Sequence, residues 1–468
     1  MIYDLAIIGG GSAGLSIAAA AAQFGQKVVL FEKGEMGGDC LNSGCVPSKS
    51  LIAAAKSAQA QRSSARYGVA AVEPKINYAK VMDYVQSVIA QIAPNDSASR
   101  FESLGVIVIQ TTAKFVSTRT LEADGKRYEA RRIVIATGSR AGVPPIPGLK
   151  DVPYLTNETI FKNQIQPKHF VIIGGGPIGM EMAQAHRRLG SEVTVLEGMK
   201  ALAKDDPELT AVVLDAVKAE GVQVREGVTI ANVSMKKGGV AVTLKGGEVV
   251  SGSHILVAAG RVPNLESLNL EAGGVAHDKR GITVDQSLRS ISNRHVYAAG
   301  DVAGGLQFTH VAGYHAGLII RNALFRLPVK SRSDIIPWVT YTDPELAQVG
   351  LNEADARKSL GTVKVLKWHF AENDRAQTEG QTKGLIKIIL GKRGVIVGAS
   401  IVGAHAGELI APFVLAVTEK IKISVFANLV LPYPTLSEIG KRAAIANYAG
   451  LAQKPLTRRL LGVLKIFG

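Results

Sequence analysis

The feature that most constrains this chain is a strand–glycine loop–helix–strand pattern that occurs twice. The first copy is IYDLAIIGGGSAGLSIAAAAAQFGQKVVLFEK and the second is HFVIIGGGPIGMEMAQAHRRLGSEVTVLEG. Each copy joins an apolar strand to G-x-G-x-x-G, then a helical segment, then a second apolar strand that ends at an acidic residue. This is the full fingerprint of a dinucleotide-binding βαβ unit. Two copies predict an α/β chain that binds two nucleotides.

Each residue of the fingerprint has a physical role. Gly9 makes the tight turn, Gly11 lets backbone N–H groups approach a pyrophosphate, and Gly14 allows the helix to pack closely on the strand. The helix N-terminus supplies positive potential to the phosphates, and Glu32 accepts hydrogen bonds from ribose hydroxyls. A glycine-rich turn without a ligand is the alternative, and the strand, helix and acid in register disfavour it. The remaining predicted nucleotide-binding residues of the two copies are Ser12, Gly174, Gly176, Gly179 and Glu197.

The acid of the second copy bears on the choice of nucleotide. A carboxylate at Glu197 favours the free 2′-hydroxyl of NAD, whereas NADP sites usually offer an arginine there. Lys200 follows closely and keeps NADP as the alternative. We therefore expect NAD(H), with NADP(H) as the second choice.

Length and composition set further bounds. A chain of 468 residues suggests about three domains. Its 47% apolar content is ordinary for a globular protein, and no apolar run reaches the ~18 residues of a membrane span. The net charge of +15 comes from scattered basic residues without a recognition motif, so we expect no nucleic-acid partner. Two cysteines and a first strand that begins at Ile2 favour a cytoplasmic protein without a targeting peptide.

Both cysteines lie in one short stretch, GGDCLNSGCVPSK, at positions 40 and 45. Positions five apart in a straight helix rise ~7.5 Å, beyond the ~6.8 Å limit for the Cα atoms of a disulfide. Bridging therefore needs a bent turn, which Asn42, Ser43 and Gly44 can provide. A distorted loop suits a bond that opens and closes. One alternative is a metal site, but the other ligands are missing. The other is a structural disulfide, but a disulfide that closes so short a loop would add little stability.

In three further blocks an apolar strand is followed directly by small residues: RRIVIATGS, HILVAAGRVPN and RHVYAAGDVAGG. Small residues let the backbone approach a ligand closely. From about Ile336 the pattern changes to alternating strands and helices without a glycine fingerprint, which predicts an α+β domain.

The chain resembles a class I pyridine nucleotide–disulfide oxidoreductase in its two fingerprints, the cysteine stretch, these three blocks, YTDPELAQVG and PTLSE. Within that family it is most similar to dihydrolipoamide dehydrogenase and to the catalytic core of mercuric reductase. The resemblance implies a glutathione reductase-like fold with two Rossmann-like domains and a C-terminal dimerisation domain. The implied boundaries are 1–150 for the first part of the FAD domain, 151–274 for the NAD(P) domain, 275–333 for the second part of the FAD or central domain, and 334–468 for the interface domain.

The resemblance also implies roles for individual residues. Hydride would pass from nicotinamide to FAD, and electrons would then reach a disulfide between Cys40 and Cys45 and finally a small-molecule or protein-bound disulfide or electrophile. Cys45 would lie against the flavin and Cys40 would meet the substrate. Lys49 and Glu181 would form an ion pair beside the flavin. Further implied FAD or nucleotide contacts are Thr137, Gly138, Gly260 and Asp301. No metal is expected.

The C-terminal motif departs from the family pattern HPTxSE. Here it is LPYPTLSE, so Tyr433 stands where the acid–base histidine of the partner subunit belongs, and Glu438 remains. Histidine titrates near ~6.5 and tyrosine near ~10, and loss of a positioned acid–base typically costs ~10² to 10⁴ in rate. Tyr433 could donate a hydrogen bond, carry a charge if its pKa were depressed, or simply pack beside a cis Pro434.

The departure leaves several functions open. Mercuric reductases also carry tyrosine in this region but add a vicinal cysteine pair, and this chain has no third cysteine. Soluble transhydrogenases carry tyrosine before the proline but usually lack the first cysteine, which is present here as Cys40. A transhydrogenase or diaphorase (quinone reductase), with electrons leaving the flavin directly, is the alternative enzyme class. A flavin-bearing redox sensor is the non-catalytic alternative.

The tail PLTRRLLGVLKIFG, residues 455–468, predicts a basic amphipathic helix. Its leucines, Val463 and Phe467 share one face, whereas Arg458, Arg459 and Lys465 lie opposite. Such a helix can lie on an anionic membrane, here the inner surface of the cell membrane, or bind a partner. Packing of the apolar stripe on the enzyme's own surface is the alternative.

Overall fold

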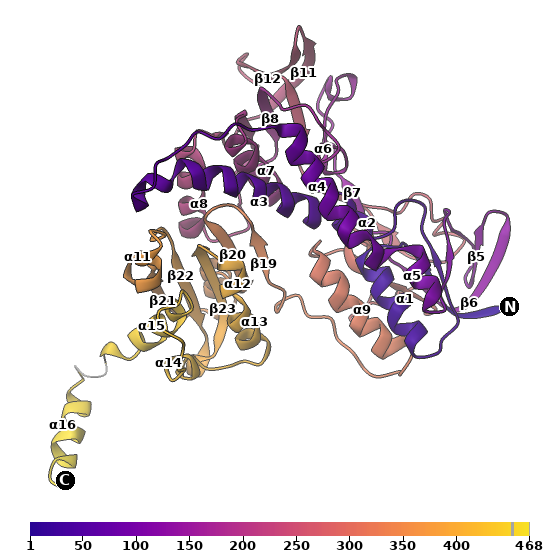
Figure 1. The fold of residues 1–468 in the computed structure, drawn as a ribbon. Helices are drawn as coiled ribbons and strands as arrows, with labels where there is room; N and C mark the ends of the chain where they lie inside the picture. The colour runs from indigo at the N-terminus through magenta and orange to yellow at the C-terminus, as the bar shows by residue number, and fades with distance from the viewer. Residues whose placement is uncertain (451–453, 468) are drawn as a thin grey trace. The chain divides into compact units, whose positions relative to one another are not determined.

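The computed structural model describes residues 1–450 and 454–467 and divides the chain into two compact units (Figure 1). The first unit comprises Met1–Ala201 and Val222–Ser333, and the second comprises Leu202–Gly221 and Asp334–Gly468. No helix in the described part of the chain combines the length and the apolar character needed to cross a membrane.

The largest sheet of the first unit has the strand order β3-β2-β1-β6-β5-β4, and β18 also pairs with β6. Its strands β1, β2, β3, β6 and β18 pair in parallel, whereas β4 and β5 form an antiparallel edge. Leu5 to Ile8 are buried, as expected for a parallel strand covered on both faces. The strands are β1 (Ile2–Ile8), β2 (Val28–Phe31), β3 (Ile107–Ile109), β4 (Lys114–Ser117), β5 (Thr120–Ala123), β6 (Lys126–Ile135) and β18 (Val296–Ala298).

Helices α1 (Ser12–Gln23) and α9 (Thr309–Ala323) lie side by side and pack on this sheet (Figure 1). The alanine-rich sequence of α1 permits the close approach, because Ala18 and Ala21 are fully buried in the core that both helices share with β1 and β2. The first glycine loop therefore opens between a parallel strand and a rigidly packed helix.

The second fingerprint builds a smaller parallel sheet of order β10-β9-β8-β14 in the same unit. Helix α7 (Pro177–Arg188) follows β8, and an antiparallel sheet of β11, β12 and β13 adjoins β8 through β13. Valines and isoleucines of both sheets form one core. The strands are β8 (His169–Ile173), β9 (Glu192–Leu196), β10 (Gln223–Arg225), β11 (Ile230–Lys236), β12 (Gly239–Leu244), β13 (Val249–Gly252) and β14 (His254–Val257).

The rest of the first unit consists of connecting helices and two short strand pairs. The pair of β7 (Ser139–Ala141) and β15 (Arg261–Pro263) joins the segment after β6 to the segment after β14. The other elements are α2 (Gly38–Asn42), α3 (Cys45–Arg62), α4 (Tyr78–Ile92), α5 (Ala98–Ser103), α6 (Asn157–Ile160), β16 (His277–Asp278) and β17 (Gly281–Ile282).

The second unit is built on an antiparallel sheet of order β19-β20-β23-β22-β21. Residues of β22 are buried along its whole length, which fits its interior position between β23 and β21. The strands are β19 (Trp338–Thr340), β20 (Glu345–Gly350), β21 (Lys364–His369), β22 (Leu385–Leu390) and β23 (Ile396–Gly403). The helices are α8 (Pro207–Ala219), α10 (Glu353–Leu360), α11 (Asp374–Thr378), α12 (Ala406–Leu409), α13 (Ala411–Thr418), α14 (Ile423–Ala427), α15 (Glu438–Ala446) and α16 (Pro455–Leu464).

A buried lysine explains why α8 belongs to the second unit. Lys387 on β22 has a side chain that is 4% exposed, and its Nζ lies 2.7 Å from Asp206, 3.0 Å from Glu208 and 2.9 Å from Glu353. Asp206 caps the N-terminus of α8. Removing Lys387 would leave the buried Asp206 carboxylate uncompensated, at a cost of ~3–5 kcal/mol.

This architecture confirms the predicted fold class, an α/β chain with two Rossmann-like nucleotide-binding motifs and a C-terminal α+β part. The four residue boundaries given above stay predictions.

Candidate functional site

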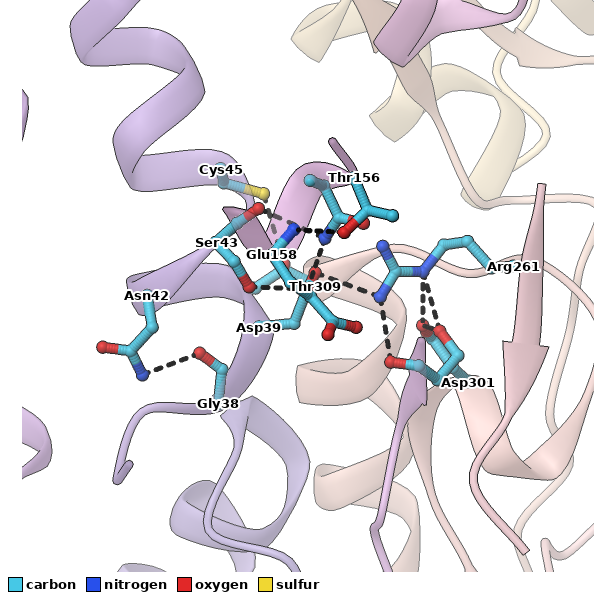
Figure 2. Close-up of polar contacts among 12 residues, drawn as sticks. Gly38, Asp39, Asn42, Ser43, Cys45, Thr156, Glu158, Arg261, Asp301 and Thr309 are labelled. Carbon is cyan, nitrogen blue, oxygen red and sulfur yellow. Dashed lines mark hydrogen bonds and ion pairs between the residues drawn. The ribbon is translucent and has the colours of Figure 1, made fainter. Parts of the chain in front are cut away.

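The two cysteines lie on either side of a break between two helices. Cys40 is in α2 and Cys45 is the first residue of α3, while Ser43 and Gly44 between them leave the helical conformation. Figure 2 shows this turn with the polar contacts around it. The bend that the spacing of the cysteines requires is therefore present. Both cysteines are free thiols, the reduced form of a pair that can cycle.

The two thiols are unequal in acidity. A hydrogen bond from Cys40 is the main reason that the pKa of Cys45 falls to about 6, and a hydrogen bond from Thr309 and the charge of Lys49 lower it further against the effect of burial. The Thr309 hydroxyl at the start of α9 lies 3.4 Å from Cys45 Sγ. The same hydrogen bond, followed by burial, raises the pKa of Cys40. At neutral pH the pair therefore holds a thiolate at Cys45 and a thiol at Cys40.

Lys49 and Glu181 form the ion pair that the resemblance implies. Lys49 Nζ donates to Glu181 Oε2 at 2.9 Å, and the Glu181 side chain is only 5% exposed. Lys49 lies one helical turn after Cys45 on α3, whereas Glu181 comes from α7 in the second fingerprint. The pair therefore links α3, the helix that begins at Cys45, to α7 of the second nucleotide-binding motif.

The first glycine loop has the geometry that its sequence predicts. Gly9 has φ +113°, a conformation that favours glycine, and a Cβ on Gly14 would collide with the carbonyl oxygen of Gly9. Glu32 Oε2 accepts from Gly10 N at 2.6 Å, and its Oε1 accepts from Gly34 N at 2.7 Å. The carboxylate is thus held at the end of β2.

The second glycine loop repeats these contacts. Gly174 has φ +112°, and a Cβ on Gly179 would collide with the carbonyl oxygen of Gly174. Glu197 accepts from Gly175 N at 2.6 Å and from Met199 N at 2.8 Å. The internal repeat therefore extends from sequence to individual hydrogen bonds.

The middle glycine of each loop faces open space. Such space is needed if the pyrophosphate of a dinucleotide is to approach the backbone. A Cβ on Gly176 would meet no atom within 4 Å, and one on Gly11 would meet only Gly38 Cα at 3.7 Å. Both loops are followed directly by a helix N-terminus, at Ser12 in α1 and at Pro177 in α7. The open space and the backbone N–H groups suit a pyrophosphate, and the fixed carboxylate suits a ribose. The first loop therefore fits FAD and the second fits NAD(P).

Two of the three strand–turn blocks meet in the β7–β15 pair. Thr137 Oγ1 donates to Asn264 O at 2.7 Å, and Asn264 Nδ2 donates to Thr137 O at 2.9 Å. Gly138 and Gly260 have φ +64° and +123°, so both turns use backbone that favours glycine. The third block contains β18, the strand beside β6, and Asp301 follows that strand. Asp301 accepts from Ser139 Oγ, so all three blocks meet.

Four residues that the sequence did not single out complete this cluster: Asp39, Asn157, Arg261 and Thr309. Asp39 accepts from Asn157 Nδ2 at 2.8 Å. It also pairs with Arg261 at 3.2 Å (Figure 2). Arg261 begins β15, Thr309 begins α9 and Asp39 precedes Cys40, so no local spacing in the sequence relates them. Only the fold brings them together.

Tyr433 and Glu438 lie in the second unit. The Tyr433 hydroxyl donates to Asp374 Oδ2 at 2.9 Å, and 68% of the residue is exposed. That hydrogen bond, with the charge of Asp374, raises the pKa of Tyr433, so the idea of a depressed pKa is not supported. The Tyr433–Pro434 peptide bond is cis, as the sequence predicts, and Glu438 begins α15.

Comparison with known proteins agrees with this geometry. The family model for pyridine nucleotide-disulphide oxidoreductases matches residues 3–316, and the model for the dimerisation domain of the same family matches residues 336–444. The chain belongs to this family. Its members are flavin-dependent enzymes that use FAD and NAD(P)H, and the matched dimerisation domain supports a homodimer.

Curated relatives and solved structures place the chain among several branches of the family. It is 34% identical to mercuric reductase of Lysinibacillus sphaericus over 450 residues, covering 95% of this chain and 82% of the relative. It is 36% identical to dihydrolipoyl dehydrogenase of Thermus scotoductus over 454 residues, covering 93% and 95%. LpdA from Mycobacterium tuberculosis has a TM-score of 0.88 at 27% identity, covering 96% and 100%. The HOCl-induced flavoprotein disulfide reductase RclA from Escherichia coli has a TM-score of 0.85 at 26% identity, covering 95% and 99%.

Proposed function

We propose that the chain is an NADH-driven flavoprotein reductase that works through Cys40 and Cys45 on a disulfide or another thiol-reactive electrophile. The observation that carries this proposal is the unequal dithiol. Cys45 lies beside Thr309 at 3.4 Å and one helical turn from the Lys49–Glu181 pair, in a setting that stabilises a thiolate. Serine variants of the two cysteines test the assignment.

The residues of the first unit divide the work. Bound FAD would accept hydride from the nicotinamide and deliver an electron pair to the disulfide. The first glycine loop and Glu32 would bind its adenosine half, and Asp301 its ribityl or pyrophosphate region. Lys49 would hold a positive charge near the flavin, with Glu181 fixing the position of that charge at 2.9 Å. Cys40, the neutral thiol of the pair, would meet the substrate.

Preference for NADH over NADPH follows from the second loop. Both oxygens of Glu197 are held by backbone N–H groups, so the carboxylate stays where it would accept from the 2′-hydroxyl and repel a 2′-phosphate. Lys200, the residue that could favour a phosphate, pairs with Glu226 at 3.7 Å. Glu226 also accepts from Ala201 N at 2.8 Å, which holds the same loop.

Tyr433 favours a substrate whose leaving group departs without taking up a proton. In a homodimer of this family the C-terminal motif would face the disulfide of the partner subunit. A phenol that donates to Asp374 is neutral at pH 7 and cannot take up a proton as a histidine would. A thiol-reactive electrophile with a good leaving group therefore fits the exit from Cys40 better than a dithiol such as dihydrolipoamide.

Tyr433→His is expected to raise NAD⁺ reduction by dihydrolipoamide by ~10²-fold, because an imidazole beside Asp374 would restore the acid–base group. The measurement is steady-state NADH formation with the holoenzyme. Tyr433→Phe is the matched control and should leave this activity at the wild-type level. Rapid oxidation of dihydrolipoamide by the wild type, or no gain in the histidine variant, would contradict the proposed substrate class.

A transhydrogenase or diaphorase remains the second candidate. The tyrosine before Pro434, which soluble transhydrogenases also carry, is the observation that favours it. In that case electrons would leave the flavin directly and turnover would not need the cysteines. The same serine variants separate the two functions.

We also propose that α16 contacts an anionic lipid surface. No described side chain of α16 is buried, and Leu456 in its first turn is 79% exposed. Phe467, three residues after the end of the helix, is 82% exposed. Arg458 and Lys465 lie on the opposite face, so burying the apolar stripe in a bilayer would bring positive charge to the headgroups.

Truncation of residues 455–468 is expected to abolish co-sedimentation with phosphatidylglycerol-containing vesicles, because the helix supplies both the apolar and the basic contacts. Vesicles of phosphatidylcholine alone and a series of salt concentrations are the controls, since attraction to anionic lipid weakens as salt rises. Equal co-sedimentation with and without the tail would rule out the membrane contact. So would a truncation that alters only the oligomeric state of the protein and leaves vesicle binding unchanged.

A further inference from the structure

Arg261 lies between two carboxylates that serve different parts of the site. Its Nη2 is 3.2 Å from Asp39 Oδ2, and its Nε is 3.6 Å from Asp301 Oδ2. The guanidinium also donates from Nε to Ser139 Oγ at 2.7 Å and from Nη2 to the Ser139 carbonyl at 3.1 Å. The Arg261 side chain is only 13% exposed and that of Asp39 is 36% exposed, so the guanidinium is shielded from water and the carboxylate is partly open to it.

Asp39 ties this cluster to the outer thiol. It occupies the first turn of α2 and directly precedes Cys40. Its Oδ1 accepts from Asn157 Nδ2 at 2.8 Å and from Ser43 Oγ at 3.0 Å, so the carboxylate bonds both to the turn between the cysteines and to the start of α6. Asn157 also donates to the Ser43 carbonyl at 3.3 Å. The turn is therefore held by one carboxylate and the groups around it (Figure 2).

The charges around Cys40 come from several elements. Asp39 precedes it on α2 and pairs with Arg261 of β15, which also pairs with Asp301 in the segment after β18. Cys45 and Thr309 hydrogen-bond to the thiol from α3 and α9. Lys49 and Glu181 form a closed pair on the Cys45 side. Among these groups Asp39 is the negative charge next to Cys40, and Arg261 is the positive charge that offsets it.

We propose that Arg261 is a positioning residue for the outer thiol, and that it sets the reactivity of Cys40 by holding and balancing the Asp39 carboxylate. Removal of the Asp39 charge makes Cys40 more reactive, and removal of the Arg261 charge makes it less reactive. The inference rests on the proposed role of Cys40, but its test reads the thiol itself and does not require turnover.

The test uses the flavin-loaded Cys45→Ser protein, in which Cys40 is the single remaining cysteine of the chain. The rate of alkylation by iodoacetamide is measured across pH, because only the thiolate reacts. Asp39→Asn is expected to raise the rate at pH 7.5 about three- to tenfold and to shift its pH profile to lower pH, and Arg261→Met is expected to lower the rate by a similar factor. The double variant should return toward the parent rate.

Arg261→Lys keeps the charge and should stay within about twofold of the parent rate. Arg140→Met is the matched control on the same strand pair, because Arg140 pairs with Glu266 at 2.6 Å and does not touch Asp39. If Arg261→Met does not retain flavin, Arg261→Gln makes the same contrast. Shifts of the Asp39 and Arg261 variants in the same direction would show simple loosening of the turn and would overturn the proposal, as would no shift in either.

Discussion

Replacement of Cys45 by serine is expected to lower NADH-driven reduction of a disulfide or electrophile by at least ~10³-fold, because Cys40 alone cannot form the disulfide that would accept the electron pair from the flavin. The effect should fall on turnover and leave binding of NADH unchanged, since Cys45 lies on α3 and not in the second glycine loop. Steady-state NADH oxidation with the candidate acceptors measures it.

Cys40→Ser is the matched variant, and it should be equally inactive with a disulfide because the outer thiol is missing. Both variants should still reduce ferricyanide or a quinone, which accept electrons from the flavin directly. Near-wild-type turnover of the physiological acceptor in both variants would instead identify a transhydrogenase or diaphorase.

Gly176→Ala is expected to raise the KM for NADH by about 10- to 100-fold, equivalent to ~1.4–3 kcal/mol of lost binding. The added methyl group meets no protein atom within 4 Å and the backbone φ of −73° suits alanine, so the protein should fold with its flavin in place. The methyl group would occupy the space in which the pyrophosphate of the nicotinamide nucleotide has to lie. Initial rates over a range of NADH and NADPH concentrations measure the effect, and the wild type should prefer NADH.

Gly11→Ala is the counterpart in the first loop, and it should instead reduce the flavin content of the purified protein while the fold is retained. Gly317→Ala is the control, because this exposed glycine on α9 also has no atom within 4 Å of an added Cβ. An unchanged KM for both nucleotides in Gly176→Ala would mean that the second loop does not bind a dinucleotide.

The nucleotide loops could be predicted from sequence because they are local. A strand, three glycines, a helix and an acid within about 30 residues fix the turn, and the structure reproduces it twice, down to the contacts of Glu32 and Glu197. The break between Cys40 and Cys45 could also be predicted, because the length of a disulfide excludes a straight helix.

The contacts around the thiols could not be predicted in the same way. Arg261 lies more than 200 positions after Asp39 and reaches it only because β15 pairs with β7. Thr309 reaches Cys45 through the packing of α9, and Asp374 reaches Tyr433 through the fold of the second unit. Without the family resemblance, no local pattern relates Lys49 to Glu181. Their pairing depends on tertiary structure.

The most direct test of the central claim is anaerobic titration of the flavin-loaded protein with NADH, followed by absorbance at long wavelength. We predict a thiolate-to-flavin charge-transfer band at pH 7.5 that is absent in Cys45→Ser. Because the pKa of Cys45 is lowered to about 6, the band should persist above that pH and fade as the pH drops through it and the thiolate takes up a proton. Bleaching of the flavin by NADH with no such band at any pH would contradict the account.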